Sequence, residues 1–276
     1  MHDIAPTKKP MKPEALASLA KAREAMQGIS PRARGAEKTR LALEWIYRWG
    51  WSSPTLLDLV TDGKRTGLAA RLTRQKLITS TKTESGGGVK GIPIHMLTLT
   101  NLGREEVERH REDLINYEID PYRVDQSKLR HDQLAQRATA NSLKNKTILD
   151  FKTPNELSAK SEKGVKQPDV LWIRQDRTRM GIEVELSAKW DRKLDEFVLG
   201  CVRSLHKNPT NPKPNEVDEI ALVSDSRAIL KRYAKAFTAG EDLTIWEKNT
   251  RGHWNPQKTI AIPNLVTGKI QCVFLE

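Results

Sequence analysis

The chain has 276 residues, of which 37% are hydrophobic and 30% charged, with a formal net charge of +12 at pH 7. This composition predicts a packed core shared by about two domains and excludes wholesale disorder, and no apolar run reaches the roughly 18 residues that insert into a membrane. Cys201 and Cys272 are the only cysteines, too few for a disulfide framework or a four-thiolate zinc site, and with no apolar secretory segment at the start we expect a cytoplasmic protein.

The positive charge is concentrated in two blocks. Residues 1–104 carry a net charge of +10 and residues 127–276 carry +7, whereas residues 105–126 between them carry −5. Two basic blocks beside an acidic connector indicate two surfaces that meet a polyanion. Charge alone supports solubility equally well.

The first part of the chain predicts an arm and a compact unit. Residues 1–35, interrupted by four prolines, are expected to be a flexible basic arm. Residues 36–112 are expected to form one domain, in which apolar spacing and turn residues predict three helices, two strands joined by a glycine-rich loop, and a further helix. Their expected ranges are 36–50, 55–60, 64–75, 77–81, 94–100 and a helix from 101 onward.

Three helices followed by a two-stranded hairpin is the element order of a winged helix-turn-helix. The third helix is basic, so it can enter a major groove and reach phosphates or base edges. The predicted DNA-binding residues are Lys64, Arg65, Arg71 and Arg74 on this helix and Lys82 and Lys90 in the hairpin. Winged helices also bind proteins, but the charge favours double-stranded DNA.

An acidic connector at 113–126 precedes the second expected domain, residues 127–276. Its pattern alternates helices and strands. The expected elements are a helix at 127–145, strands at 146–151, 169–174 and 181–187, a helix at 188–206, a strand at 218–223, a helix at 225–236 and a strand at 243–247. The tryptophans are expected mostly in the core, and for Trp254 packing is favoured over stacking on a base.

Three carboxylates are predicted to meet on this second domain. Side chains alternate along a strand, so Glu183 and Glu185 share the face opposite Ile182 and Val184. A symmetric hairpin centred near Asp176 would place Asp169 beside Glu183 across the strand pair.

Such crowding of negative charge is unfavourable unless a cation lies there. Oxygen ligands on strands suit Mg²⁺ or Mn²⁺, which makes Asp169, Glu183 and Glu185 candidate metal ligands. A metal ion at this place would assist phosphodiester cleavage. The alternative is an edge strand whose glutamates are solvated.

Asp169 followed by Glu183-Val184-Glu185 resembles the PD-(D/E)XK nuclease signature, and the element order is similar to the αβββαβ core of restriction endonucleases. The resemblance implies an α/β (α+β) fold with a winged helix in front of that core. It implies that the three acids are catalytic metal ligands. Glu185 stands where the family pattern has lysine, so Lys189 or Lys193, one helical turn apart, is expected to replace it.

The winged helix, an "HD" pair that opens a helix and the "PDV…EVE…RKLDEF" segment together resemble the replication-relaxation family, which includes the MOB-C type relaxases of mobilisable plasmids. This resemblance implies that His131 and Asp132 lie near the metal site. It implies a nickase that acts on the DNA of a plasmid transfer origin to start conjugative mobilisation. The implied partners besides DNA are accessory relaxosome proteins and a secretion coupling protein.

Two alternatives stay open: a restriction or repair endonuclease of the same fold, and a non-catalytic DNA-binding regulator or replication accessory protein. Other classes are disfavoured by missing motifs. The sequence has no H-x-H pair, which disfavours a three-histidine relaxase with a tyrosine nucleophile, and no G-x-x-x-x-G-K-[ST], which excludes a P-loop motor. The only glycine cluster, 86–88, does not open a helix, so a dinucleotide site is unsupported.

Overall fold

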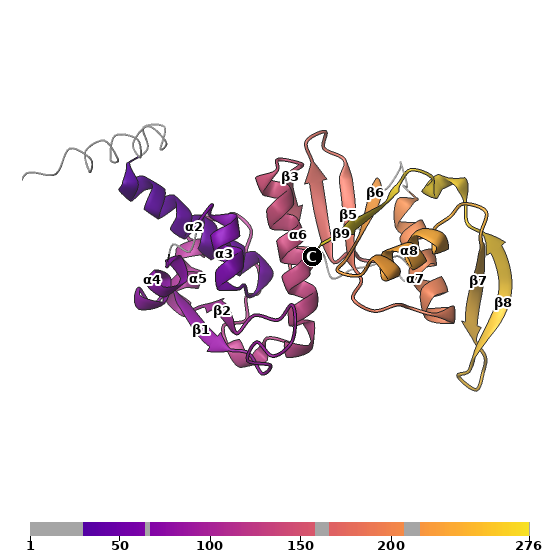
Figure 1. Cartoon of the computed structure of the whole chain (residues 1–276), viewed down its shortest axis with the longest axis horizontal. Helices are drawn as coiled ribbons and strands as arrows, with labels where there is room; N and C mark the ends of the chain where they lie inside the picture. The colour runs from indigo at the N-terminus through magenta and orange to yellow at the C-terminus, as the bar shows by residue number, and fades with distance from the viewer. Residues whose placement is uncertain (1–29, 64–66, 158–165, 207–215, 276) are drawn as a thin grey trace, which may run out of the picture.

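A computed structural model describes residues 30–63, 67–157, 166–206 and 216–275 (Figure 1). Within these ranges the chain is a mixed α and β protein, and none of the helices is long and apolar enough to pass through a bilayer. Its helices are α2 (Pro31–Trp49), α3 (Pro54–Val60), α4 (Leu68–Arg74), α5 (Asn101–Glu108), α6 (Leu129–Lys144), α7 (Asp191–Leu205) and α8 (Arg227–Ala236). Its strands are β1 (Ile78–Lys82), β2 (His95–Leu99), β3 (Ile148–Lys152), β4 (Val170–Arg174), β5 (Arg179–Val184), β6 (Glu219–Ser224), β7 (Asp242–Lys248), β8 (Trp254–Ala261) and β9 (Ile270–Phe274).

Three helices and an antiparallel hairpin form the N-terminal unit, in the order that the sequence predicts. The first helix begins at Pro31 and not at 36, because Ser30 caps it by accepting a hydrogen bond from Ala33 N. Ser53 caps α3 in the same way. The expected third helix appears as α4, and the positions 64–66 at its expected start, with most of the expected arm, lie outside the described residues.

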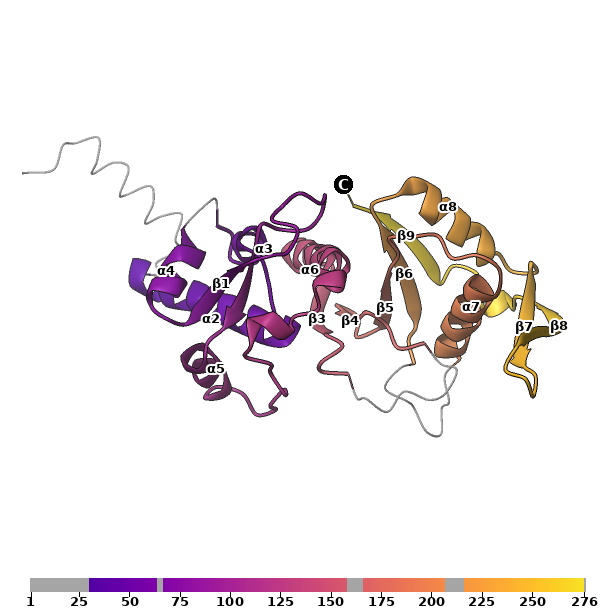
Figure 2. The same cartoon turned by 90° about the horizontal axis from the view of Figure 1, so that it is seen from below.

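The second part of the chain is built on a five-stranded sheet in the order β3-β4-β5-β6-β9. The β3-β4-β5 part is antiparallel, and β5, β6 and β9 are parallel to one another. Helix α6 lies on one face of this sheet, and α7 and α8 lie on the other (Figure 2). Both faces are therefore buried, and apolar side chains alternate between the two layers.

The strand register agrees with the prediction. Val170 lies opposite Ile182 and Leu171 opposite Gly181, so the hairpin is symmetric about residue 176. Asp169 N donates a hydrogen bond to Ile182 O at 2.9 Å, which extends the pairing to the residue next to Glu183. Ile182 and Val184 pack toward α6, which directs Glu183 to the opposite face.

The second part differs from the prediction in three places. The strand expected at 243–247 is present as β7, and it pairs with β8, a strand that the sequence pattern did not predict, in a separate hairpin beside α7. The edge of the central sheet is formed by β9, which was not predicted either. Helix α7 begins at Asp191 and not at 188, so Lys189 precedes the helix and does not share a helical face with Lys193.

Helix α6 is the element that both parts of the chain share. Trp45 and Leu57 of the N-terminal unit belong to the same buried cluster as Val170 and Trp172 of the sheet. The amide of Gln136, fully buried on α6, accepts a hydrogen bond from Trp45 Nε1 at 2.8 Å and donates one to Trp51 O at 3.0 Å. A satisfied buried amide allows only one packing of its neighbours, so it fixes α2 against α6.

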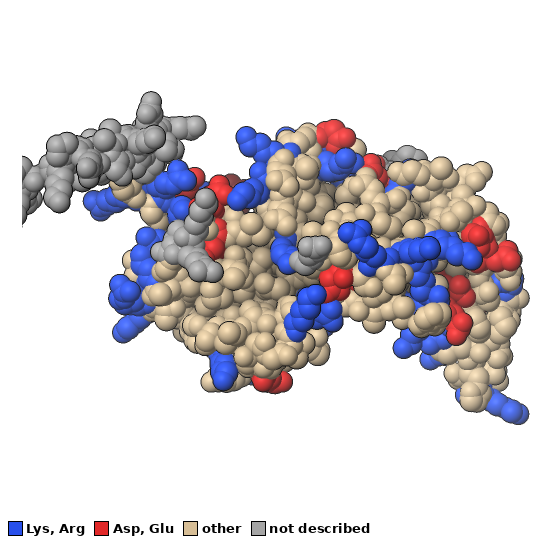
Figure 3. Space-filling model, in the orientation of Figure 1, with Lys and Arg blue, Asp and Glu red and all other residues tan. Residues whose placement is uncertain are grey.

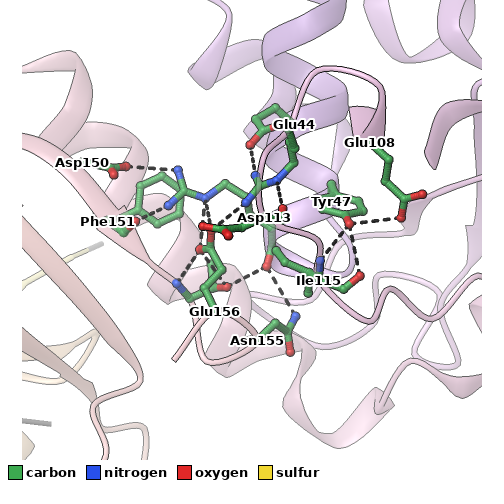
Figure 4. A network of polar contacts seen from close by, with 12 residues as sticks. Glu44, Tyr47, Glu108, Asp113, Ile115, Asp150, Phe151, Asn155 and Glu156 are labelled. Atoms are coloured by element: carbon green, nitrogen blue, oxygen red, sulfur yellow. Dashed lines mark hydrogen bonds and ion pairs between the residues drawn. The ribbon is translucent and has the colours of Figure 1, made fainter. Parts of the chain in front are cut away.

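Arg48 at the end of α2 makes a second connection to the sheet, through Asp150, Phe151 and Glu156, which are labelled in Figure 4. Its guanidinium lies 3.0 Å from Glu156 Oε1 and 3.1 Å from Asp150 Oδ1, and it stacks 3.8 Å from the centre of the Phe151 ring. Arg111 contacts Glu156 as well, at 3.5 Å. Arg48 and Glu156 are mostly buried, with 13% and 11% of their side chains exposed, so water compensates their charges poorly.

We expect Arg48→Met to lower the free energy of unfolding by about 3 kcal/mol, because Glu156 then keeps a buried charge with only Arg111 to compensate it. Urea unfolding followed by circular dichroism measures this. Arg123→Met is the matched control, since the ion pair of Arg123 with Glu118 is exposed and should change stability by less than about 0.5 kcal/mol. Equal losses in the two variants would contradict the role given to Arg48.

Candidate functional site

Asp169 and Glu183 lie side by side at the end of the β4–β5 hairpin. Asp169 precedes β4 and accepts a hydrogen bond from Val184 N at 2.8 Å through Oδ2. Glu183 is buried, with 4% of its side chain exposed. Burial and the negative charge of Asp169 raise the pKa of Glu183 above its usual range, whereas the ammonium group of Lys166 lowers it and favours the ionised carboxylate. The pair is therefore crowded negative charge, as the sequence predicted.

Lys166 places a positive charge between these two carboxylates. Its Nζ lies 2.7 Å from Glu183 Oε2 and 3.9 Å from Asp169 Oδ1. Burial alone would lower the pKa of Lys166, but the charges of Glu183 and Asp169 outweigh it and raise the pKa. The sequence predicts only a polar loop around Lys166. No short-range pattern indicates that this lysine contacts the acids of the sheet.

The approach of Lys166 depends on Gly200 in α7. Lys166 N donates a hydrogen bond to Gly200 O at 3.2 Å, and a Cβ on residue 200 would lie 3.2 Å from Lys166 Cβ. One turn along α7 from Phe197, Cys201 is completely buried, and its pKa is raised by burial and by the charge of Glu183. Helix α7 thus covers this face of β5.

Glu185 has partners of its own. Its carboxylate pairs with Lys189 Nζ, and Tyr233 of α8 donates a hydrogen bond to Glu185 Oε2 at 2.8 Å. Of the two candidate lysines, Lys189 is the one that contacts an acid of the cluster, and it lies in the turn before α7. Lys193 is exposed on the first turn of α7.

His131 connects α6 to the acidic cluster, which consists of Asp169, Glu183 and Glu185. Its Nε2 lies 3.1 Å from Asp169 Oδ2 and its Nδ1 lies 3.0 Å from Asp132 Oδ1. Two carboxylates accept from both ring nitrogens only when the ring is an imidazolium. Burial lowers the pKa of His131, but the hydrogen bonds to Asp132 and Asp169 outweigh it and raise the pKa to about 10. Trp51 Nε1 donates to Asp132 Oδ2 at 3.3 Å, which ties this arrangement to the N-terminal unit.

The carboxylate oxygens of the acidic cluster are the type of ligand that a hard divalent cation prefers. Glu183 Oε2 is buried and has no aligned hydrogen-bond donor among the described residues, so the contact with Lys166 is an ion pair and leaves lone pairs free. Asp169 faces the same ammonium. However, nowhere in the described ranges do three His, Cys, Asp or Glu side chains gather as a ready metal-binding group. Asp169 and Glu183 are thus the two candidate ligands, and Glu185 would first have to leave Lys189.

The predicted DNA-binding residues are placed unequally. Arg74 on α4 is exposed, as are Lys82 and Lys90 of the hairpin. Arg71, in contrast, points to α2 and donates hydrogen bonds to Thr39 Oγ1 at 3.1 Å and to Gly35 O at 3.3 Å. Lys64 and Arg65 lie outside the described residues.

A cavity of about 590 Å³ joins the hairpin loop (residues 83–94) to α6. Its lining includes Lys90 and Gly91 of the loop and Arg130 and Arg137 of α6, and it reaches Leu186, the residue after Glu185. A Cβ on Gly91 would lie 3.2 Å from Arg130 Cγ, so the loop packs directly on α6. Lys90, Arg130 and Arg137 therefore give the cavity three basic groups among mostly apolar side chains, and Asp225, the ion-pair partner of Arg130, lines it too.

Comparison of the chain with protein-family models, with curated proteins and with solved structures gives no match in any of the three.

We expect Lys166→Met to lower the free energy of unfolding by about 2 kcal/mol, because it leaves the buried carboxylate of Glu183 unpaired. The loss should be at the low end for buried ion pairs, since a third of the Lys166 side chain is exposed. Glu183→Gln in the same chain should restore most of the stability, as no buried charge then lacks a partner. Denaturant unfolding measures all variants, and Lys193→Met is the control for removal of an exposed charge. Identical losses in Lys166→Met and Lys193→Met would refute the pairing.

Proposed function

We propose that the protein is a cytoplasmic, metal-dependent DNA endonuclease. The observation that carries this proposal is the buried carboxylate of Glu183 beside the partly exposed Asp169, with the ammonium group of Lys166 close to both. A stable core does not require two acids there, because apolar side chains of similar size usually stabilise at least as well. Buried ionisable groups with strongly shifted pKa values, such as Glu183, Lys166 and His131, are typical of functional sites.

Mg²⁺ or Mn²⁺ held by Asp169 and Glu183, with Glu185 as a third ligand, would acidify a bound water and neutralise charge on a phosphate. The residues of the chain supply the remaining roles. Lys189 is placed to contact a phosphate once Glu185 releases it. His131 keeps Asp169 oriented by a hydrogen bond, and Asp132 holds the other side of the imidazolium ring.

The N-terminal unit would hold the DNA. Its element order is that of a winged helix, and exposed Arg74 on α4 is placed to meet a phosphate or a base edge. The cavity that Lys90, Arg130 and Arg137 line lies between the hairpin loop and α6, and α6 also carries His131, which contacts Asp169. A duplex held by α4 and the hairpin would have to extend along α6 to reach the carboxylates.

Within this proposal, the PD-(D/E)XK-like order α6-β3-β4-β5-α7-β6 and the motifs that resemble the replication-relaxation family favour a nickase at a plasmid transfer origin. Accessory relaxosome proteins and a secretion coupling protein would be its partners. A restriction or repair endonuclease would use the same groups but cut both strands.

A second candidate function is a DNA-binding regulator without catalysis. The observation that favours it is that Lys166 and Lys189 already neutralise Glu183 and Glu185. In such a protein these ion pairs would stay closed, and the acids would bind no divalent ion. Calorimetric titration with Mn²⁺ separates the two candidates.

We expect the protein to nick supercoiled DNA that carries its target site when Mg²⁺ or Mn²⁺ is present. Glu183→Gln and Asp169→Asn should each lower the rate by about a thousandfold, since loss of a metal ligand removes several kcal/mol of transition-state stabilisation. Gel separation of supercoiled, nicked and linear DNA measures the rate. Glu241→Gln, an exposed acid elsewhere, is the control and should cut normally. Unchanged nicking by Glu183→Gln would refute the assigned site.

We expect Arg74→Ala to weaken duplex binding severalfold and to reduce the slope of log affinity against log salt by about 0.9, the value for one phosphate contact. Lys90→Ala should have a similar effect. Fluorescence anisotropy with a labelled duplex at several salt concentrations measures both. Arg109→Ala on α5 removes an equally exposed charge and should leave the slope unchanged. An unchanged slope in Arg74→Ala would place the DNA on another surface.

A further inference from the structure

Two tryptophans of the second part lie at the surface, against the expectation that they are core residues. Trp190 is 61% exposed and Trp254 is 40% exposed, whereas Trp45, Trp49, Trp51 and Trp172 are buried. Exposed indole rings lose the benefit of burial, which makes them uncommon on a surface that binds nothing.

Each exposed indole is accompanied by cationic side chains. The guanidinium of Arg232 lies 3.4 Å above the ring centre of Trp190, and Arg192 and Lys248 lie 4.3 and 5.2 Å from that of Trp254. Arg232 is fixed in place because its Nε donates a hydrogen bond to Lys189 O at 2.9 Å. Figure 3 shows Lys and Arg side chains gathered over the part of the molecule that contains α7 and α8.

The two indoles are connected to Glu185 through neighbouring residues of one segment. Trp190 directly follows Lys189, whose ammonium pairs with Glu185. Arg192, two residues further on, also pairs with Glu196 at 2.5 Å and reaches the Trp254 ring on β8. The hairpin that carries Trp254 is held on α7 through Trp246, whose Nε1 donates to Asp195 Oδ2 at 2.7 Å.

We propose that Trp190 with Arg232 and Trp254 with Arg192 form a binding site for the unpaired bases of single-stranded DNA. An indole ring with a cation beside it matches the two halves of a nucleotide, because the base stacks on the ring and the phosphate pairs with the cation. Bases in a duplex are stacked on one another and cannot stack on a side chain, so the ligand is unpaired.

This inference rests on the proposed function and deepens it, since it names the form of the DNA that lies next to Glu185. The strand that passes over Trp190 would be opened before it reaches the carboxylates. The duplex would be held by the N-terminal unit, on the other side of α6.

The test is binding of a labelled oligothymidylate of about 16 nucleotides, long enough to cover such a site, measured by anisotropy in EDTA so that no cleavage occurs. Trp190→Ala and Trp254→Ala should each weaken binding about thirtyfold, the middle of the range for one stacked base. Trp190→Phe should restore part of the affinity because it keeps an aromatic face. Duplex affinity should not change, and Tyr122→Ala, an exposed aromatic residue on the connector, should bind as the wild type does.

Unchanged oligothymidylate affinity in the folded Trp190→Ala and Trp254→Ala variants would overturn this site and leave the indoles to a protein partner. Absence of oligothymidylate binding by the wild-type protein would overturn it too. A different result would refute the proposed endonuclease. If the wild-type protein never nicks DNA while the tryptophan variants lose single-strand binding, the endonuclease is refuted and the stacking site is retained.

Discussion

The structure depends on the compensation of two neighbouring carboxylates on the sheet by positive charge from two other parts of the chain. Asp169 and Glu183 come from neighbouring strands, Lys166 from the segment before β4, and His131 from α6 on the opposite side of the sheet. Removal of any partner leaves an unpaired charge in a place that water reaches poorly. The cluster therefore constrains how the sheet, α6 and α7 lie against one another, and Gly200 is required because Lys166 passes so close to α7.

A second constraint is the position of α6 between the two parts of the chain. Gln136 and His131 of this helix are less than two turns apart and have different partners. Gln136 holds α2 through Trp45 and the backbone at Trp51, whereas His131 contacts the acidic cluster. Asp132 accepts from Trp51 as well as His131. In the proposed function, a surface that grips DNA and a site that cuts it would be held at a constant separation by one rigid helix.

The sequence predicted those features that follow from short-range periodicity. The alternation around Glu183 and the symmetry about Asp176 gave the correct face and the correct strand register. It could not predict Lys166, because the contact depends on how a loop returns to the sheet. Trp190 was expected in the core since it adjoins an apolar helix, but Asp191 adopts a left-handed φ of 43°, which starts α7 late and leaves the ring outside. Strand β9 was missed because residues 249–269 separate it from the rest of the pattern.

The burial of Cys201 has a practical consequence. Cys201 is part of α7, and its thiol is buried near Glu183 with a raised pKa, so it is protonated and shielded, whereas Cys272 on the edge strand is exposed. A thiol reagent should modify Cys272 in the native protein and reach Cys201 only when α7 lifts from the sheet. Mass spectrometry would detect the first adduct, on Cys272, before the second, on Cys201. The delay between them measures how often α7 separates from the sheet and exposes the acidic cluster.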